Sequence, residues 1–281
     1  MVVESSSRAI MDQYRTHLMP AFYINLDEDM DRRALLEAEL SRAGIQAERV
    51  AAVLGRAVPD WLQSFYDERL APGEVGCSAS HLVICTNIIE RQLPYALVLE
   101  DDARLASDMK AVIQRAVELA PQGWDIIRLI ETSKDRVQVL AAVGEGRNLV
   151  RYLRIPRSTT GMIVSASGAR KLLSRRLIKE PIDVEIRWPW QLGLDVYGID
   201  PPVVEQASEK SLPTTIPHRS MPRKYNQLRR MIFNIRKMGL SEYLACRFGL
   251  GRRANTRIFP AAGGNFSRFR NFVAPMSLML I

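Results

Sequence analysis

The chain has 281 residues, of which 47% are hydrophobic and 25% are charged, and its formal net charge at pH 7 is +8. This size allows one large α/β domain with an appendage, and ordinary Gly and Pro contents exclude collagen-like and low-complexity proteins. No apolar run reaches the ~18 residues of a membrane-spanning helix, and the N-terminus lacks the apolar core of a secretory signal. We therefore expect a cytoplasmic protein.

The positive charge is concentrated at the C-terminal end. From His218 to Ile281 there are thirteen Lys or Arg residues and a single acid, Glu242, whereas the rest of the chain carries a small excess of acids. We expect an N-terminal extension over 1–19, a central domain over 20–216 and a basic tail over 217–281.

Apolar runs and apolar residues at helical spacing alternate through the first half of the central domain. They predict, in order, a strand over 21–26, a helix over 29–43, a strand over 47–53, a helix over 73–91 and a strand over 95–99. In the first helix Leu35, Leu36, Leu40 and Ala43 share one face, and Gly44 is expected to end it.

The second half begins in the same way and then changes. The pattern predicts a helix over 108–119 and then strands over 124–130, 137–143, 149–155 and 161–165. A helix is expected from Ser165 through Leu172, Leu173 and Leu177, and another from near residue 181. A strand over 194–199 and helices over 228–238 and 241–248 complete the predicted elements. Alternating strands and helices indicate a mixed, mostly parallel sheet covered on both faces, with a helical C-terminal appendage.

The three cysteines indicate reduced thiols. Cys77 and Cys85 fall in one predicted helix, eight residues and therefore about 12 Å apart along its axis, which is beyond disulfide reach. Cys246 is distant in sequence, and all three are expected to be small buried side chains.

Three consecutive carboxylates, Glu100, Asp101 and Asp102, directly follow the strand over 95–99. They repel one another unless a positive charge lies among them, and the carboxyl end of a strand in an open sheet is where ligands bind. Oxygen donors with no His or Cys close by in the sequence suit Mg²⁺ or Mn²⁺ rather than zinc. The alternative is that these acids simply begin a loop.

Six ordered segments resemble glycosyltransferase family 25, which includes the bacterial lipooligosaccharide galactosyltransferases. They are "FYINLDEDMDRR", "GEVGCSASHL", "LPYALVLEDDARL", "WDIIRL", "TTGMIVSASGARKLL" and "PID" followed by "LDVYGIDPPVVEQ", between about Ala21 and Gln206. The resemblance implies a GT-A-like nucleotide-binding fold, a UDP-sugar donor, an inverting transfer, and a sugar hydroxyl of a glycolipid as acceptor.

The resemblance also assigns the acidic motif to a divalent cation, Mn²⁺ or Mg²⁺, that bridges the carboxylates and the UDP diphosphate. Asp102 is the first choice for direct ligation. Glu100 and Asp101 would ligate the ion, hold its waters or bind the ribose, and the sequence does not rank the two.

An inverting transfer needs a base for the proton of the acceptor hydroxyl. Asp183, in the "PID" segment at a predicted helix start, is the preferred candidate and Glu185 the alternate. The competing interpretation of Asp183 is an ordinary helix N-cap.

The nucleotide and sugar are expected to contact three further groups of residues. Asn25 and Asp27 end the first strand, and Arg32 and Arg33 follow it; Glu28 stands where the family often has a basic residue. His81 is either a buried core residue or part of the site, with Ser80 as its partner. Thr159 and Thr160 line the sugar pocket or are turn residues. The complete set is Asn25, Asp27, Arg32, Arg33, Ser80, His81, Glu100, Asp101, Thr159 and Thr160.

The basic tail interleaves Arg and Lys with Met231, Ile232, Phe233, Ile235 and Met238. A basic amphipathic helix is typical of membrane-surface binding, so we expect an anionic membrane, with the enzyme peripheral on the inner face of the bacterial cytoplasmic membrane. Nucleic acid is the less favoured partner, and a merely solvated face is the third possibility.

The sequence thus predicts a metal-dependent hexosyltransferase, with galactose as the expected sugar. A metal-dependent phosphohydrolase or nucleotidyltransferase, and a non-catalytic membrane-binding protein on a degenerate transferase scaffold, remain as alternatives. The oligomeric state is not predicted.

Overall fold

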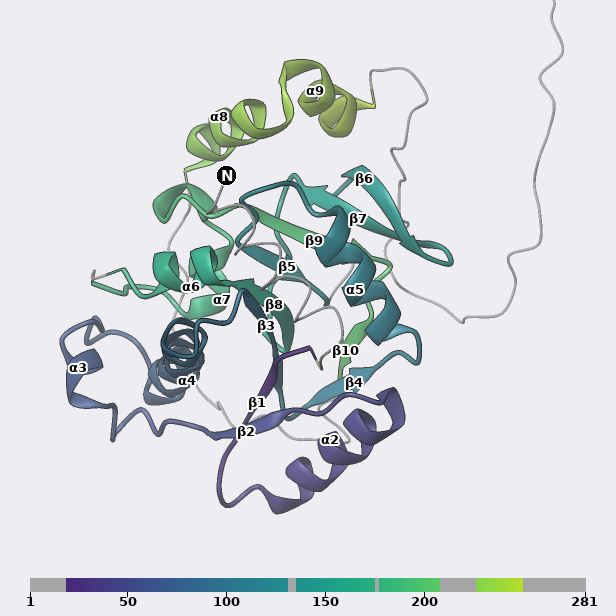
Figure 1. The fold of residues 1–281 in the computed structure, drawn as a ribbon. Coiled ribbons are helices and arrows are strands. Elements are labelled where there is room, and N and C mark those ends of the chain that lie inside the picture. Colours follow the sequence, from purple (N-terminus) through teal and green to yellow (C-terminus); the bar gives the residue numbers. More distant parts are fainter. Residues whose placement is uncertain (1–18, 131–134, 175–176, 208–225, 250–281) are drawn as a thin grey trace, which may run out of the picture.

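The computed structural model describes residues 19–130, 135–174, 177–207 and 226–249, so the predicted N-terminal extension and most of the basic tail lie outside the described residues. At its centre is an eight-stranded sheet with the strand order β2-β1-β3-β8-β5-β9-β7-β6 (Figure 1). The strands are β1 (Ala21–Asn25), β2 (Glu48–Ala51), β3 (Tyr95–Glu100), β5 (Ile126–Arg128), β6 (Val137–Gly144), β7 (Arg147–Tyr152), β8 (Gly161–Ser165) and β9 (Val196–Asp200).

The sheet is mixed, and most of its strands point the same way. The pairings β1–β2, β1–β3 and β5–β9 are parallel, and those that involve β7 or β8 are antiparallel. Only β7 and β8 therefore run against the common direction within the described sheet. This confirms the predicted mixed, mostly parallel α/β fold.

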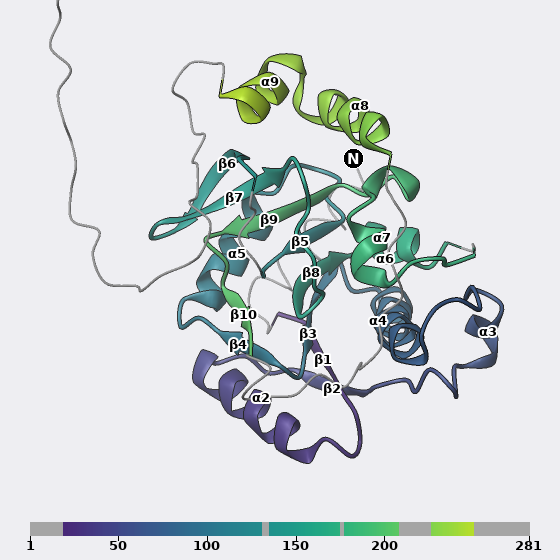
Figure 2. The ribbon, with the colours of Figure 1, turned by 180° about the vertical axis from the view of Figure 1, so that it is seen from behind.

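Helices cover both faces of the sheet, as Figures 1 and 2 show. One face packs on α2 (Met30–Ala43) and α5 (Met109–Leu119), with Leu36, Leu40 and Ile113 in its core. The other face packs on α4 (Pro72–Glu90), α6 (Ala166–Leu172) and α7 (Ile182–Ile186). The sheet is therefore buried on both sides, which explains why β1, β8 and β9 are apolar along most of their length.

Several helix ends follow directly from the sequence. Gly44 ends α2 in the left-handed conformation, as predicted. Ser165 begins α6, and its hydroxyl accepts a hydrogen bond from the Gly168 amide at 3.0 Å. Two residues were predicted in the wrong place. Leu35 was expected on the buried face of α2 but is 42% exposed. Leu177 was expected within α6, but this helix ends before it because its last turn closes at Leu173.

Three short elements were not predicted. Helix α3 (Asp60–Gln63) lies in the connection before α4, and β4 (Ala103–Leu105) pairs with β10 (Val204–Gln206) in a separate two-stranded sheet. Each is too short to show a periodic pattern. The β4–β10 pair joins segments about a hundred residues apart, which local sequence cannot reveal.

The described part of the basic tail folds onto the domain. Helices α8 (Gln227–Met238) and α9 (Leu240–Phe248) lie together along one end of the molecule (Figures 1 and 2). Met238 and Cys246 pack on Leu153, and the Asn234 amide donates a hydrogen bond to the Leu153 carbonyl at 2.9 Å. Among the residues that the structure describes, we find no helix with the length and hydropathy needed to cross a bilayer.

Candidate functional site

The candidate residues gather at one edge of the sheet. The carboxyl ends of β1, β3 and β5 and the start of β8 meet there, which brings Asn25, Glu100, Arg128 and Gly161 close to one another in the strand register. In open α/β sheets this is the edge at which ligands bind.

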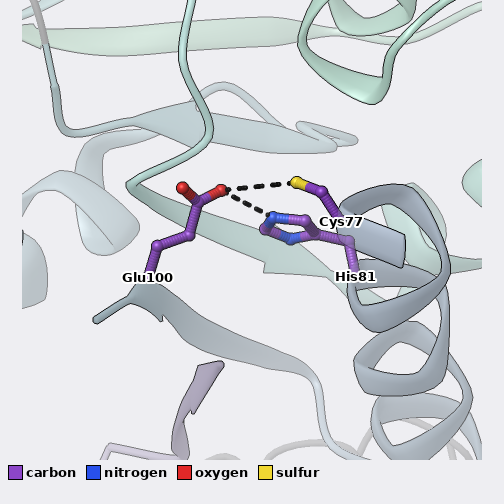
Figure 3. Close-up of side chains that lie close together, drawn as sticks. All are labelled: Cys77, His81 and Glu100. Carbon is purple, nitrogen blue, oxygen red and sulfur yellow. Dashed lines mark hydrogen bonds and ion pairs between the residues drawn. The ribbon is translucent and has the colours of Figure 1, made fainter. Parts of the chain in front are cut away.

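Glu100 is held by residues from two other elements. His81 Nε2 lies 3.1 Å from Glu100 Oε1, and the Thr159 hydroxyl donates to the same oxygen at 2.6 Å. The Cys77 thiol lies 3.9 Å from this oxygen, so α4 presents two side chains to the end of β3 (Figure 3). Burial would raise the pKa of Glu100, but the hydrogen bond and charge of His81, together with Thr159 and Arg128, outweigh it and lower the pKa.

Asp101 is buried and fully engaged. The Asn25 amide donates to Oδ2 at 2.8 Å, and Arg32 Nε donates to Oδ1 at 2.8 Å. Asn25 in turn accepts a hydrogen bond from Arg49 Nε at 3.1 Å. Asp101 therefore ties the end of β3 to the end of β1 and the start of α2, which leaves its oxygens little capacity for a ligand.

Asp102 is also buried but incompletely paired. Gln206 Nε2 donates to Oδ2 at 2.8 Å, and Arg32 Nη2 approaches the same oxygen only to 3.7 Å. Within the described residues Oδ1 is buried without a hydrogen-bond partner. Burial, with Glu100 as the second cause, raises the pKa of Asp102 to about 6.

The three carboxylates are thus stabilised mostly by protein groups. Glu100 has His81 and the charge of Arg128, Asp101 has Arg32, and Asp102 has an amide and a distant guanidinium. The charge of Asp102 is offset less closely than that of Asp101, because Arg32 lies 2.5 Å from Asp101 but 3.7 Å from Asp102. The side chains face inward: Asp101 and Asp102 are 7% and 8% exposed.

A cation fits this arrangement in part. The buried Oδ1 of Asp102 lacks a partner, and a hard oxygen donor there suits Mg²⁺ or Mn²⁺. The three carboxylates do not form a single cluster, however. Within the described residues, the one set of three ligand atoms that all lie within 4.8 Å of each other comes from Cys77, His81 and Glu100.

This set corrects one step of the sequence reasoning, which held that no His or Cys is near the acidic motif. Cys77 and His81 are four residues apart on α4, so they share a face of the helix, and the fold places that face against Glu100. Burial, reinforced by the charges of Glu100 and Asp183, raises the pKa of Cys77 well above its ordinary value, which keeps the thiol protonated.

The predicted base, Asp183, lies near this group. It occupies the second residue of α7, which packs against α4, and its charge reaches Cys77. The N-cap of α7 is Pro181, so Asp183 is not the helix cap. Among the described residues, Asp183 has no hydrogen-bond or ion-pair partner, whereas the alternate base Glu185 is buried.

Four other residues predicted to bind the nucleotide or sugar are exposed or bind other protein groups. The Asp27 side chain is 81% exposed and pairs with Arg49, and Arg33 pairs with Glu37 on the outer surface of α2. Ser80 does not contact His81 through its hydroxyl, which accepts a hydrogen bond from the Val53 amide at 2.8 Å and donates one to the Gly76 carbonyl. The Thr160 hydroxyl bonds Ser158 at 2.9 Å.

Three residues of the site were not predicted from the sequence. Arg128 is completely buried at the end of β5, where it donates to the carbonyls of Arg157 and Ser158 and acts on Glu100 through its charge. A charged residue inside the apolar segment "WDIIRL" was the signal that could have found it. Cys77 was signalled by its spacing to His81. Nothing local signals Gln206.

Comparisons with known proteins place this chain among glycosyltransferases by sequence. The model described as "Glycosyltransferase family 25 (LPS biosynthesis protein)" matches residues 19–186, which is more than half of the chain. "Procollagen galactosyltransferase 1-B" of Xenopus laevis is 32% identical over 183 residues, covering 58% of this chain and 29% of the relative.

Two further relatives show the range of the matches. "Glycosyltransferase 25 family member" of Drosophila melanogaster is 30% identical over 187 residues, and "Probable inactive glycosyltransferase 25 family member 3" of Bos taurus is 28% identical over 180 residues. Each match covers 58% of this chain but only 29% or 30% of the relative, so the chain spans less than a third of the length of these relatives.

A solved structure, "crystal structure of a glycosyltransferase involved in the glycosylation of the major capsid of PBCV-1", is 10% identical with a TM-score of 0.32. It covers 65% of this chain and 93% of that chain. A score this low adds nothing to the fold assignment, which rests on the sheet itself.

Proposed function

Since the chain belongs to glycosyltransferase family 25, we propose that it transfers a hexose from a UDP-sugar to a hydroxyl of a lipopolysaccharide or lipooligosaccharide core glycan. The sugar that we propose is galactose, which the names of its relatives suggest. The observation that carries this proposal is the buried Asp102 at the carboxyl end of β3, with one oxygen unpaired and a pKa of about 6. The nearest cation to Asp102 among the described residues, Arg32 Nη2, is 3.7 Å away, so the charge of Asp102 is only weakly offset.

The partner that we propose is a divalent cation, Mn²⁺ or Mg²⁺, held by Asp102 with Glu100 as the second carboxylate. When bound, the ion would offset the negative charge that develops on the departing diphosphate. Asp101 is not a ligand in this proposal. Its hydrogen bonds to Asn25 and Arg32 hold the backbone that carries Asp102.

Three further residues orient the metal-binding carboxylate Glu100 or accept the proton of the acceptor hydroxyl. His81 and Thr159 orient Glu100 and keep it ionised, since both favour its charged form. Asp183, which has no partner within the described residues, takes the proton of the acceptor hydroxyl in a single displacement with inversion.

Association with an anionic membrane is the last part of the proposal. The outer surface of α8 carries exposed Leu228, Met231 and Ile232 beside Arg229 and Arg236. A surface helix with an apolar stripe beside cations suits the boundary between lipid headgroups and acyl chains, where a glycolipid acceptor would be found.

The test is an assay of UDP release over a panel of UDP-sugars with a lipooligosaccharide acceptor, with EDTA and then with Mn²⁺ restored. We expect one UDP-hexose to be consumed, activity to fall with EDTA, and Asp102→Ala to lose it while Asp60→Asn on the exposed helix α3 retains it. Release of free phosphate would identify a phosphohydrolase. Full activity in Asp102→Ala, or none with any donor, would contradict the proposal.

A further inference from the structure

Donor atoms of three kinds lie together near the carboxyl end of β3, on Cys77, His81 and Glu100. Cys77 and His81 are four residues apart on α4, and both point toward Glu100 (Figure 3). A thiolate sulfur, an imidazole nitrogen and a carboxylate oxygen are the ligands that zinc takes in proteins. We propose that these three side chains form a zinc site, whose ligands differ from the oxygen donors proposed for Mn²⁺ or Mg²⁺ at Asp102.

The distances between the donor atoms fit one tetrahedral ion. Zinc binds sulfur at ~2.3 Å and nitrogen or oxygen at ~2.0–2.2 Å, which places neighbouring ligand atoms ~3.3–3.5 Å apart at the tetrahedral angle. Glu100 Oε1 lies 3.1 Å from His81 Nε2 and 3.9 Å from Cys77 Sγ, and the three ligand atoms all lie within 4.8 Å of one another. Small rotations of the Cys77 and Glu100 side chains close the set around an ion, with the fourth position left for water.

The ligands are held in position before an ion binds. His81 is buried within α4, and the Thr159 hydroxyl donates a hydrogen bond to Glu100 Oε1 at 2.6 Å. A carboxylate that ligates a metal is commonly oriented by an outside hydrogen bond of this kind. Because the side chains are already ordered, binding an ion costs less conformational entropy.

Zinc binding requires a defined protonation state of two ligands. The Cys77 thiol loses its proton to solvent as the bond from Sγ to the ion forms. His81 must offer the lone pair of Nε2, so the neutral imidazole carries its proton on Nδ1. Within the described residues Nδ1 has no hydrogen-bond partner, so no protein group there holds the ring in the opposite tautomer.

The charges around the thiol favour a divalent cation. Glu100, Asp183 and Asp102 all act on Cys77 through their negative charges. These charges disfavour a bare thiolate, but they attract a sulfur-bound Zn²⁺, because the ion brings two positive charges and the thiolate only one negative charge. Arg128 acts on Glu100 with the opposite sign. Among these groups the carboxylates outnumber the guanidinium.

The experiment uses the full chain, with Co²⁺ as a coloured substitute for Zn²⁺. A thiolate bound to Co²⁺ gives a charge-transfer band in the near ultraviolet that oxygen ligands do not give, and titration with Zn²⁺ displaces the Co²⁺ and measures the affinity for zinc. The site variants are Cys77→Ala and His81→Gln. The matched control is Cys246→Ala, which removes a buried thiol from α9. Circular dichroism establishes that each variant is folded.

We expect the band in the wild type and in Cys246→Ala, its loss in Cys77→Ala, and an affinity for Zn²⁺ at least about tenfold lower in His81→Gln. Zn²⁺ should also protect Cys77 of the wild type from alkylation by N-ethylmaleimide, as measured by mass spectrometry, and this readout needs no variant to fold. The proposal is overturned if the wild type gives no band, or if Cys77→Ala keeps it. Since no readout needs catalysis, the result is independent of UDP release.

Discussion

Asp102 is a buried carboxylate whose charge is only weakly offset by its neighbours. Its pKa of about 6 lies above the ordinary value of 3.8, because burial and the charge of Glu100 disfavour the ionised form. Between these two values the unfolded chain has released the proton and the folded chain retains it. The contribution of Asp102 to the free energy of unfolding is therefore fully present below about pH 3.8, where the carboxyl group is protonated in both states. It is lost as the pH rises to about 6, because the folded state must then ionise a buried group.

We predict that Asp102→Asn removes this pH dependence. The neutral amide keeps the shape without the charge, so the variant should be more stable than the wild type above about pH 6, by at most ~3 kcal/mol, and similar to it below about pH 4. Urea denaturation followed at both pH values measures the difference. A stability difference between the two proteins that does not grow across this window would contradict the assignment.

Addition of Mn²⁺ provides a separate test at the same residue. Above about pH 6 the ion should raise the melting temperature of the wild type and leave that of Asp102→Asn unchanged, because a ligand that binds only the folded state stabilises it. Cys77→Ser should still respond if Asp102 is the principal ligand. Loss of the response in Cys77→Ser would assign the ion instead to the set of Cys77, His81 and Glu100.

The role of Asp183 can be tested by measuring UDP binding and sugar transfer separately. We predict that Asp183→Asn binds UDP normally and loses sugar transfer by about 10²–10⁴-fold, because the amide cannot accept the proton of the acceptor. Calorimetry with UDP and the UDP-release assay give the two quantities. Weakened UDP binding with proportionate loss of transfer would place Asp183 in the donor site.

At the scale of elements, α4 positions Cys77 and His81, and its own position depends on two glycines. A Cβ on Gly76 would lie 2.4 Å from the Val53 carbonyl oxygen, and one on Gly55 would meet the Pro72 carbonyl at 1.7 Å. The first turn of α4 therefore approaches the backbone that follows β2 more closely than other residues allow.

We predict that Gly76→Ala destabilises the fold by about 1–3 kcal/mol, because the backbone must move to admit the methyl group. Donor-dependent activity should fall further than stability alone explains, since Cys77 and His81 move with the helix. Gly144→Ala is the comparison, because its Cβ would meet only a methyl of Val112, at 2.9 Å. Equal denaturation midpoints for Gly76→Ala and the wild type would rule out this account.

Helix ends can be predicted from local sequence, whereas strand lengths cannot. Helix α2 ends at Gly44 and α6 begins at Ser165 because each residue supplies a specific backbone conformation or side-chain cap, and these bounds were predicted. Strand β5 is only Ile126–Arg128, although its apolar segment is longer, because pairing with β8 and β9 ends there. Strand length is set by partners, which are distant in sequence.

For the molecule as a whole, docking of α8 and α9 on the domain fixes which side chains remain outside. Met238 and Asn234 face the body, whereas Leu228 and Ile232 are 57% and 40% exposed. The predicted domain boundary at residue 217 lies outside the described residues. Residues 226–249 themselves pack against the central domain.

We predict that Leu228→Ser with Ile232→Ser reduces binding to anionic vesicles by about thirtyfold or more without lowering thermal stability, since each exposed side chain contributes about 1–2 kcal/mol when it enters lipid. Co-sedimentation measures the effect. Leu54→Ser with Leu177→Ser, similarly exposed but not part of α8, is the matched control. Equal losses in both variants would indicate unspecific adsorption rather than docking through α8.

The amino-acid sequence by itself determined the order of the longer helices and strands, the mixed α/β class and the acidic motif at the end of β3, because periodicity, caps and apolar runs are local properties. The tertiary structure decided what surrounds that motif. Asp101 is bound by Arg32, Glu100 by His81 and Thr159, and Asp102 by Gln206. These contacts join segments that are close only after strands pair and helices pack, so the charge and hydrogen bonding of each carboxylate depend on the fold.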